Sequence, residues 1–520
     1  MAEDGEQARP RTMFGRVLSV GGLTLVSRVA GFARDIVLAA MLGAGPLADA
    51  FFVALRLPNH FRAIFAEGAF NAAFVPAYAR EMQQNGTGAA RFFADRVFTV
   101  LLASQLLLLA FALLFTPLVV RVLAPGLGDD AARFPLAVEL TRITFPYLLL
   151  MTLVTLLSGI LNAVHRFAAA AAAPILLNLT MITTLALAAF FPSAGHAAAW
   201  GVLIAGCLEV LLVAGDAWKA GVSVKLRWPS WGDDLRRFFR ALGPATVGSA
   251  GVQIALLADT VIASFLSVGA LSALYYADRL NQLPIGMIGI AVGTVLLPEM
   301  ARRIAAGDES GARNAQNRAM ELTLLLSTPF LAGFLIAPEL IMRAMFSRGA
   351  FSAADAAAAG ATLRAYAIGL LPFVLIRSQV AVFFARGDTA TPVKAALAAA
   401  AVNIMLKIVL AGPFGQVGLA IATSIGAWIN LGLVAWMAYR MGLWTIDDPL
   451  RKTLPKILLT LSILMLVLWG GARGMDNFLP AAMRFRDETQ LLTLIMVGAV
   501  VYGGLVLVLF RRRLRTMFKV

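Results

Sequence analysis

Cysteine and histidine are nearly absent from this chain of 520 residues, which has one cysteine, Cys207, and only three histidines. A single cysteine excludes an intramolecular disulfide framework and a cysteine metal cluster, and the scattered histidines show no zinc-ligand spacing. The sequence also lacks a nucleotide-binding motif, a metal-binding acidic motif and a nucleophile–base constellation. We therefore expect no metal, no cofactor and no enzymatic activity.

Acidic residues are also scarce: 29 Asp and Glu stand against 44 Lys and Arg, which gives a net charge of +15. An excess of positive charge can indicate nucleic-acid binding. Here the basic residues do not gather on one soluble face, because many stand at the ends of apolar runs and others stand inside them. We therefore expect no nucleic-acid partner.

Hydrophobic residues, in contrast, make up 60% of the chain, and the mean hydropathy is +0.81. Apolar runs of about 20 residues recur from end to end, and each can cross a hydrocarbon core roughly 30 Å thick. Continuous runs, rather than alternating residues, indicate helices and not a β-barrel. The first run contains arginines and no small-residue cleavage site, so it is expected to be a retained span.

The sequence predicts an all-α, polytopic membrane protein with about 14 transmembrane helices. Their approximate limits are residues 17–42, 46–78, 97–120, 136–163, 168–190, 197–218, 238–267, 271–300, 320–345, 357–385, 393–411, 416–439, 454–471 and 489–510.

Lys and Arg in the connecting segments predict the orientation. One set of helix ends carries about 28 of them and the alternate set about 7, and the basic side is expected to be cytoplasmic. Both termini then lie in the cytoplasm, which requires an even number of spans.

The chain also repeats itself at an offset near 220 residues. Residues 45–80 match residues 269–302, FPYLL at 145–149 matches LPFVL at 371–375, and Asn178 matches Asn403. An even number of helices in each half gives parallel repeats with a binding site between them. The predicted domains are an N-terminal lobe (1–220), a C-terminal lobe (221–445) and two additional spans with a basic tail (446–520).

Several motifs are familiar. The chain contains SRVAGFARD at 27–35, DAFFVALRLPNHFRAIFAEGAFNAAFVP at 49–76, TFPYLLL at 144–150, YYADRL at 275–280 and DTATPVK at 388–394. With them the chain closely resembles the MurJ (MviN) family of lipid II flippases. The resemblance implies the fold of the multidrug/oligosaccharidyl-lipid/polysaccharide exporter superfamily, with two six-helix lobes around a central cavity and two extra helices. It also implies the bacterial plasma membrane, lipid II and membrane lipids as partners, cell-wall synthesis or division proteins as further candidates, and a monomer.

Charged residues inside the predicted spans mark the candidate site. An ionised side chain at the centre of a span costs about 2.5–3.5 kcal/mol on insertion scales, so it usually faces a cavity or a partner. Arginine presents a planar fork that matches phosphate oxygens. We expect a diphosphate headgroup to contact Arg28, Arg34, Arg62 and Arg279.

Other polar residues beside these arginines are expected to support them or to act in gating: Ser27, Asp35, Asp49, Arg56, Glu67 and Asp278. A structural interpretation stays open for some of them. Asp35 follows Arg28 by seven residues, and Arg56 follows Asp49 by the same spacing, so either pair could be an ion pair on one helix face. Intramembrane arginines can also snorkel to the interface.

A second polar set consists of Asp259, Asn403, Lys407 and Thr423. A carboxylate, an amide and a hydroxyl could bind a coupling cation such as sodium. The Lys407 ammonium could equally occupy the place of that cation, and we favour a buried Asp259–Lys407 pair.

The function expected from the sequence is alternating-access transport of lipid II from the cytoplasmic to the outer leaflet. One alternative is a flippase for another polyprenyl-diphosphate oligosaccharide. Another is a cation-coupled multidrug exporter of the same fold, although such a protein would favour acidic residues in its cavity. The resemblance further implies that the last two spans line a groove for the lipid tail.

Overall fold

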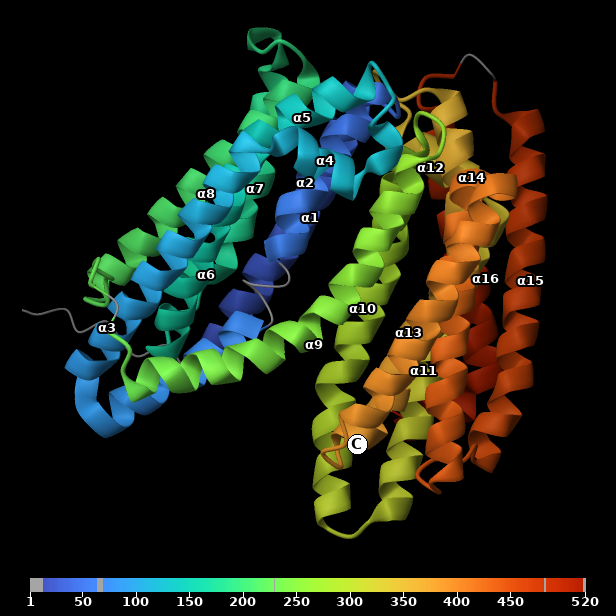
Figure 1. Ribbon diagram of the computed structural model, residues 1–520. Coiled ribbons are helices and arrows are strands. Elements are labelled where there is room, and N and C mark those ends of the chain that lie inside the picture. Colours follow the sequence, from blue (N-terminus) through green and yellow to red (C-terminus); the bar gives the residue numbers. More distant parts are fainter. Residues whose placement is uncertain (1–12, 63–68, 229, 481–482, 518–520) are drawn as a thin grey trace, which may run out of the picture. The chain divides into compact units, whose positions relative to one another are not determined.

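The computed structural model describes residues 13–62, 69–228, 230–480 and 483–517, and all regular secondary structure in these ranges is helical (Figure 1). Ten helices of the described part are long and apolar enough to cross a membrane. The predicted all-α membrane fold is therefore confirmed.

The helices group into two compact units, which contain residues Met1–Leu42 with Pro46–Val261 and residues Gly43–Gly45 with Ile262–Val520. The helices of the first unit are α1 (Met13–Leu42), α2 (Pro46–Arg62), α3 (Ala69–Leu114), α4 (Thr116–Leu123), α5 (Arg133–Thr144), α6 (Pro146–Ala163), α7 (Ala168–Ala186), α8 (Ala194–Lys219) and most of α9 (Asp233–Ser264). The second unit contains α10 (Ala270–Ala305), α11 (Glu309–Ile336), α12 (Pro338–Phe346), α13 (Ala353–Phe384), α14 (Ala390–Arg440), α15 (Asp448–Phe478) and α16 (Arg486–Met517).

Proline divides several of the predicted spans into two helices. Within the span predicted over 136–163, α5 ends at Thr144 and α6 begins at Pro146. The span predicted over 320–345 breaks in the same way before Pro338. Proline has no backbone N–H to donate, so it is tolerated at the first turn of a helix and disfavoured in its interior.

Glycine reverses the chain at two points. Gly86 inside α3 has φ 81° and ψ 173°, and Gly415 inside α14 has φ 54° and ψ −135°. The rings of Phe74 and Phe93, on either side of Gly86, stack with their centroids 5.8 Å apart. This contact shows that the two halves of α3 fold back on each other. In α14 the side-chain amide of Asn403 donates to the carbonyl oxygen of Ala422 over 2.9 Å. The predicted spans 393–411 and 416–439 are therefore two helices joined at one glycine.

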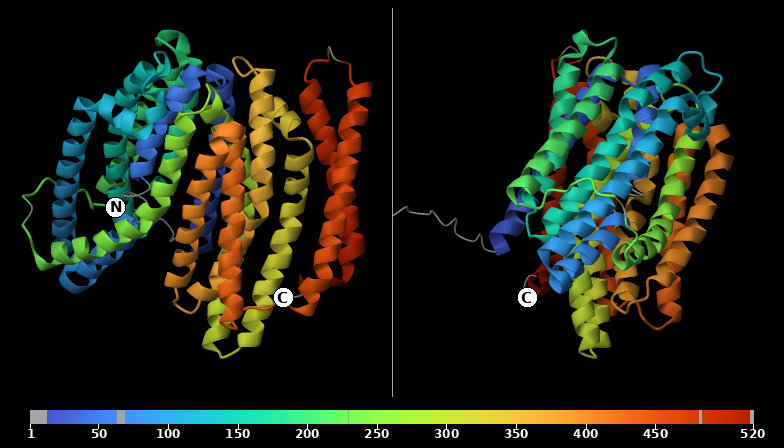
Figure 2. Two further views of the ribbon diagram at one scale, coloured as in Figure 1. Left: turned by 45° about the vertical axis from the view of Figure 1, so that its right-hand side comes forward. Right: turned by 60° about the vertical axis from the view of Figure 1, so that its left-hand side comes forward.

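The repeat expected from the sequence reappears in the packing of each unit. In the first unit α2 packs against α5 and α6, and α6 packs against α3 and α8. In the second unit α10 packs against α13, and α13 packs against α11 and α14. Helices α15 and α16 lie side by side outside this repeat, and α15 packs against α11 (Figure 2).

Each of the predicted spans contains helix, so a count of about 14 is compatible with the structure. The predicted domain limits at residues 220 and 445 fall in the segments that connect α8 to α9 and α14 to α15. These limits stay predictions.

An aromatic cluster fastens the first turns of α9 within its own unit. The Phe238 ring packs edge-on against Phe70, Phe74 and Phe93 of α3, with centroids 5.9–6.1 Å apart. Phe238 is 1% exposed. Edge-on pairs of this kind add stability beyond the area they bury, so the start of α9 is firmly held against α3.

Candidate functional site

Arg34 is the centre of a polar cluster between α1 and α7. Its Nε and Nη2 atoms donate to Oδ1 of Asp35 over 3.1 and 2.7 Å, and its Nη1 atom donates to Oδ1 of Asn178 over 3.0 Å. The amide nitrogen of Asn178 then donates to the carbonyl oxygen of Ser27 over 3.1 Å. The side chains of Arg34 and Asp35 are only 11% and 5% exposed, so this cluster fixes a guanidinium in a largely buried position.

Arg28 lies on the same helix and differs from Arg34 in its surroundings. Its side chain is exposed, and among the described residues it forms no hydrogen bond or ion pair. Asp35 forms its ion pair with the adjacent Arg34, so the optional Arg28–Asp35 pair is not formed.

Asp49 forms an ion pair that the sequence spacing did not indicate. Its Oδ2 atom lies 3.5 Å from Nη1 of Arg133 on α5, and the Asp49 side chain is fully buried. Arg56, the partner suggested by a spacing of seven, instead donates to the hydroxyl of Thr260 on α9 over 3.1 Å. The optional Asp49–Arg56 pair is therefore not formed, and Arg56 connects α2 with α9.

Asp130 extends the ion pair at Arg133 to the connecting segment before α5. Its carboxylate accepts from the backbone N–H of Arg133 over 2.8 Å and from Nε over 2.6 Å. The backbone N–H of Arg133, followed by the guanidinium, holds the pKa of Asp130 below its ordinary value. Arg133 is thereby clamped between two carboxylates.

In the second unit Arg279 lies on α10. Its guanidinium carbon lies 4.7 Å from the centroid of the Tyr275 ring, one helical turn earlier, which is a cation–π contact. The neighbouring Asp278 accepts a hydrogen bond from Gln282. Both charged residues are partly buried, and each lies in the α10 segment that matches α2 in the repeat.

The side chains of two predicted site residues, Arg62 and Glu67, lie outside the described part of the chain. Arg62 ends α2, but its side chain lies outside the described residues, and Glu67 lies outside them altogether. Their expected roles stay predictions.

The second polar set is divided between the two units. Asn403, Lys407 and Thr423 all belong to α14, where the Asn403 amide bridges the two halves and Thr423 donates to the carbonyl of Leu419. Lys407 is 3% exposed. Asp259 belongs to the first unit, so the Asp259–Lys407 pair stays a prediction. The described residues contain no group of three or more His, Cys, Asp or Glu side chains that could hold a metal ion.

Sequence reasoning missed the roles of Asn178 and Arg133. Asn178 entered only as a residue of the repeat, although an amide inside an apolar run is itself a signal of a hydrogen-bonded site. Arg133 counted only as a cation in a connecting segment. Both residues meet their partners through packing between helices that are far apart in the sequence.

Known proteins resemble this chain in sequence and in fold. Residues 38–485 match the family model described as lipid II flippase MurJ. A probable lipid II flippase MurJ of Rhizobium tropici is 39% identical over 513 residues, which cover 96% of each chain. A solved structure of lipid II flippase MurJ in an inward closed conformation is 25% identical with a TM-score of 0.80, and the match covers 96% of this chain and all of that one.

A more distant solved structure shares the fold. An inward-facing multidrug resistance MATE family transporter of the MOP superfamily superposes with a TM-score of 0.67 at 15% identity, over 84% of this chain and 99% of that one. The match of the family model over most of the sequence, together with the identity to the Rhizobium relative over nearly the full length, shows that this chain belongs to the MurJ family of lipid II flippases.

Proposed function

We propose that this protein carries lipid II from the cytoplasmic to the outer leaflet of the bacterial inner membrane. It is a multi-pass membrane transporter and not an enzyme, and its substrate is the lipid-linked precursor of peptidoglycan. Family membership is the single observation that carries this proposal. The transport mechanism proposed is alternating access through a central cavity.

The arginines are proposed to bind the diphosphate. Arg34 is held in place by Asp35 and Asn178, and Arg28 on the same helix is exposed. A fixed guanidinium and an exposed one on the same helix suit a ligand with concentrated negative charge, because guanidinium and phosphate oxygens form short charge-assisted hydrogen bonds. We extend this role to Arg62 and Arg279, which match the same family motifs.

The acidic and hydroxyl residues nearby are proposed to support these arginines. Asp35 orients Arg34, and the carbonyl of Ser27 anchors the Asn178 amide that also holds Arg34. Asp49, Arg56, Glu67 and Asp278 are proposed to act in gating or support. A carboxylate that fixes an arginine reduces the entropy lost when the substrate binds.

The orientation and energy source are part of the same proposal. Both termini are assigned to the cytoplasm from the distribution of Lys and Arg. Moving one elementary charge through 100 mV is worth about 2.3 kcal/mol, so the membrane potential is proposed as a driving force for an anionic substrate. The protein is proposed to act as a monomer, with cell-wall synthesis or division proteins as its partners.

Depletion of the protein in cells tests the function. Lipid II on each membrane face is measured by its accessibility to an external lipid II-cleaving enzyme. We expect the externally accessible fraction to fall while total lipid II is maintained or increases. Normal delivery of lipid II to the outer face after depletion would contradict the proposal.

A second experiment separates the rival substrates. Purified protein in liposomes is given lipid II, an O-antigen unit on the same polyprenyl diphosphate, or a cationic drug. Preferential movement of lipid II supports the proposal. Equal movement of both diphosphates indicates a broader flippase, and drug transport indicates an exporter.

A further inference from the structure

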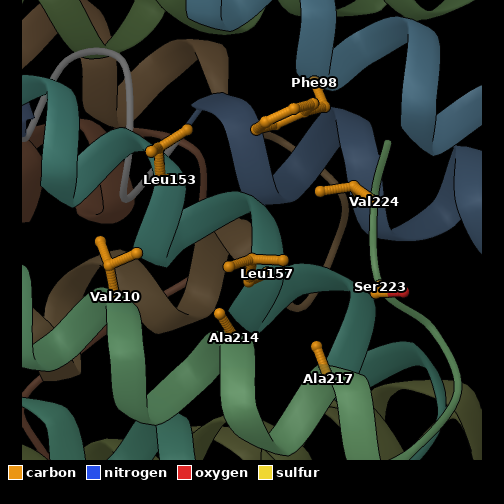
Figure 3. A pocket seen from close by; sticks show the side chains of 8 residues that line it. All are labelled: Phe98, Leu153, Leu157, Val210, Ala214, Ala217, Ser223 and Val224. Carbon is orange, nitrogen blue, oxygen red and sulfur yellow. The ribbon is translucent and has the colours of Figure 1, made fainter. Parts of the chain in front are cut away.

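A pocket of about 210 Å³ lies in the first unit (Figure 3). Its lining includes no residue of the arginine cluster, which is Arg34 with its partners Asp35 and Asn178. All but one of its lining side chains are hydrocarbon, and they come from α3, α6, α8 and the segment that follows α8: Phe98, Leu153, Leu157, Val210, Ala214, Ala217, Ser223 and Val224. An apolar cavity of roughly 150 Å³ in a protein stays dry and binds small apolar molecules. The pocket therefore suits a hydrocarbon group and not a polar headgroup.

The segment that follows α8 and lines one side of the pocket, residues 221–228, is referred to here as the α8–α9 strap. It is pinned to α3 by the buried Asp95, whose two oxygens accept from the backbone N–H of Lys225 over 2.8 Å and from Nε of Arg227 over 2.9 Å. The backbone N–H of Arg227 also donates to the hydroxyl of Thr99 over 3.0 Å. These contacts hold Ser223 and Val224 over the pocket.

The surface around the strap has the composition of a membrane–water interface. Trp218 is 73% exposed, Leu226 is 68% exposed and Trp228 is 91% exposed. Tryptophan is enriched where the hydrocarbon of a bilayer meets its headgroups, because the ring is apolar and its N–H is polar. A pocket just inside this level opens at the depth of the upper part of a lipid acyl chain.

The charge at this rim is positive. Two carboxylates of this region have arginine partners, since Asp95 pairs with Arg227 and Asp216 pairs with Arg166. Two exposed lysines add positive charge, Lys219 at the end of α8 and Lys225 within the strap. Lysines at a membrane surface attract anionic lipids and snorkel toward phosphate.

We propose that this pocket binds an anionic phospholipid of the bilayer, with one acyl chain under the α8–α9 strap and its phosphate at Lys219 and Lys225. The proposed occupant is a resident lipid of the bilayer and not the transported substrate, and its site shares no residue with the arginine cluster. Lys225 also supplies the backbone N–H that fastens the strap to Asp95, so the bound lipid stabilises the docked strap. The lipid thereby holds the connection between α8 and α9 against α3.

The test uses the full-length protein in detergent and counts bound lipids by native mass spectrometry. Phosphatidylglycerol and phosphatidylcholine with identical acyl chains are offered separately. We expect selective retention of phosphatidylglycerol. The double variant Lys219→Ser/Lys225→Ser should lower that retention roughly tenfold and leave phosphatidylcholine unchanged. The matched charge control is Arg451→Ser/Lys452→Ser, which removes two exposed positive charges of α15.

Ala214→Phe tests the pocket itself, because the added ring occupies the space of the acyl chain. It should lower phosphatidylglycerol retention several-fold, whereas Ala103→Phe at an exposed position of α3 should not. In the unmodified protein, a phosphatidylglycerol with a photoreactive acyl chain should crosslink to peptides containing residues 219–227, which gives a result even if Ala214→Phe does not fold.

The proposal would be overturned by equal retention of the two phospholipids, by unchanged retention of phosphatidylglycerol in Ala214→Phe, or by crosslinks only elsewhere in the chain. Displacement of phosphatidylglycerol by undecaprenyl phosphate would also overturn it, because the pocket would then belong to the tail of the transported substrate.

Discussion

The side chain of Asn178 on α7 holds Arg34 of α1, across 144 residues of sequence, by accepting a hydrogen bond over 3.0 Å. The same amide donates to the carbonyl oxygen of Ser27, so one side chain fixes both the arginine and the backbone of the helix that carries it. The orientation of a proposed phosphate ligand thus depends on a neutral residue of another helix.

Replacing Asn178 by leucine should reduce transport and stability together. The substitution removes an acceptor from Arg34 and a donor from the Ser27 carbonyl, and unsatisfied buried polar groups cost about 1–3 kcal/mol each. Thermal unfolding in detergent and lipid II flipping in liposomes measure the two effects. Leu179→Ala, at an exposed residue of the same helix, should change neither. An Asn178→Leu variant that transports normally would remove the positioning role.

Arg34→Ala and Arg279→Ala should each slow lipid II transport roughly ten- to hundredfold, since a hydrogen bond to a charged group is worth about 1.5–3 kcal/mol. Arg34→Lys should recover only part of this loss, because an ammonium keeps the charge but lacks the planar fork. Arg348→Ala is the control, since Arg348 is an exposed arginine paired with Glu488. Normal transport with Arg34 and Arg279 both replaced would contradict the diphosphate site.

Arg133→Met should destabilise the protein by about 3–5 kcal/mol, because the fully buried Asp49 loses its ion pair with Arg133. The double variant Asp49→Leu/Arg133→Met should be more stable than Arg133→Met alone, since it also removes the buried carboxylate of that pair. The control Arg343→Met breaks partly exposed pairs with Glu339 and Asp487 and should cost at most about 1 kcal/mol per pair. Equal unfolding temperatures of the Arg133 and Arg343 variants would show that the buried ion pair contributes no more to stability than the pairs of Arg343.

Asp308 should give the protein an acid-sensitive component of stability. Its carboxylate accepts from the N–H of Gly311 and from the Ser310 hydroxyl, which lowers its pKa in the folded state. A lowered folded-state pKa means that the stability is present above the ordinary aspartate pKa and is lost as the pH falls through the folded value. Asp308→Asn retains a side chain suited to cap α11 but does not titrate. Thermal unfolding between pH 7 and 3 should decline less steeply for this variant, and parallel curves would contradict the prediction.

Gly415→Ala should destabilise α14 by about 1–3 kcal/mol. The backbone at Gly415 has a positive φ and a ψ of −135°, a conformation that residues other than glycine rarely adopt. Gly412→Ala is the matched control. It lies three residues earlier at ordinary helical φ, with nothing within 4 Å of the added carbon, and should be neutral or slightly stabilising. Thermal unfolding of the two variants distinguishes the turn from a general effect of glycine loss.

The sequence could predict the helices because membrane-spanning segments carry a strong local signal. Long apolar runs identified the spans, and glycine and proline marked the places where helices break. The finer division was missed: the spans predicted over 136–163 and 320–345 are each two helices separated at a proline. An apolar run has the same composition on both sides of such a break.

The partners of the charged residues could not be predicted in the same way. Spacing along a helix reports which residues share a face, and so it suggested Arg28 with Asp35 and Asp49 with Arg56. The structure instead pairs Asp49 with Arg133, which is 84 residues away. Contacts of this kind depend on which helices pack together, and that depends on the whole fold.

The turn at Gly415 also bears on how the protein is made. Two membrane passes meet there with no hydrophilic loop between them, and Gly418 packs against the carbonyl of Leu410 immediately beside the bend. During synthesis the second helix follows the first directly, so the insertion machinery receives both helices before the first can be released alone. We expect the two to enter the bilayer as one prefolded hairpin, and an epitope tag inserted at this bend to block membrane integration.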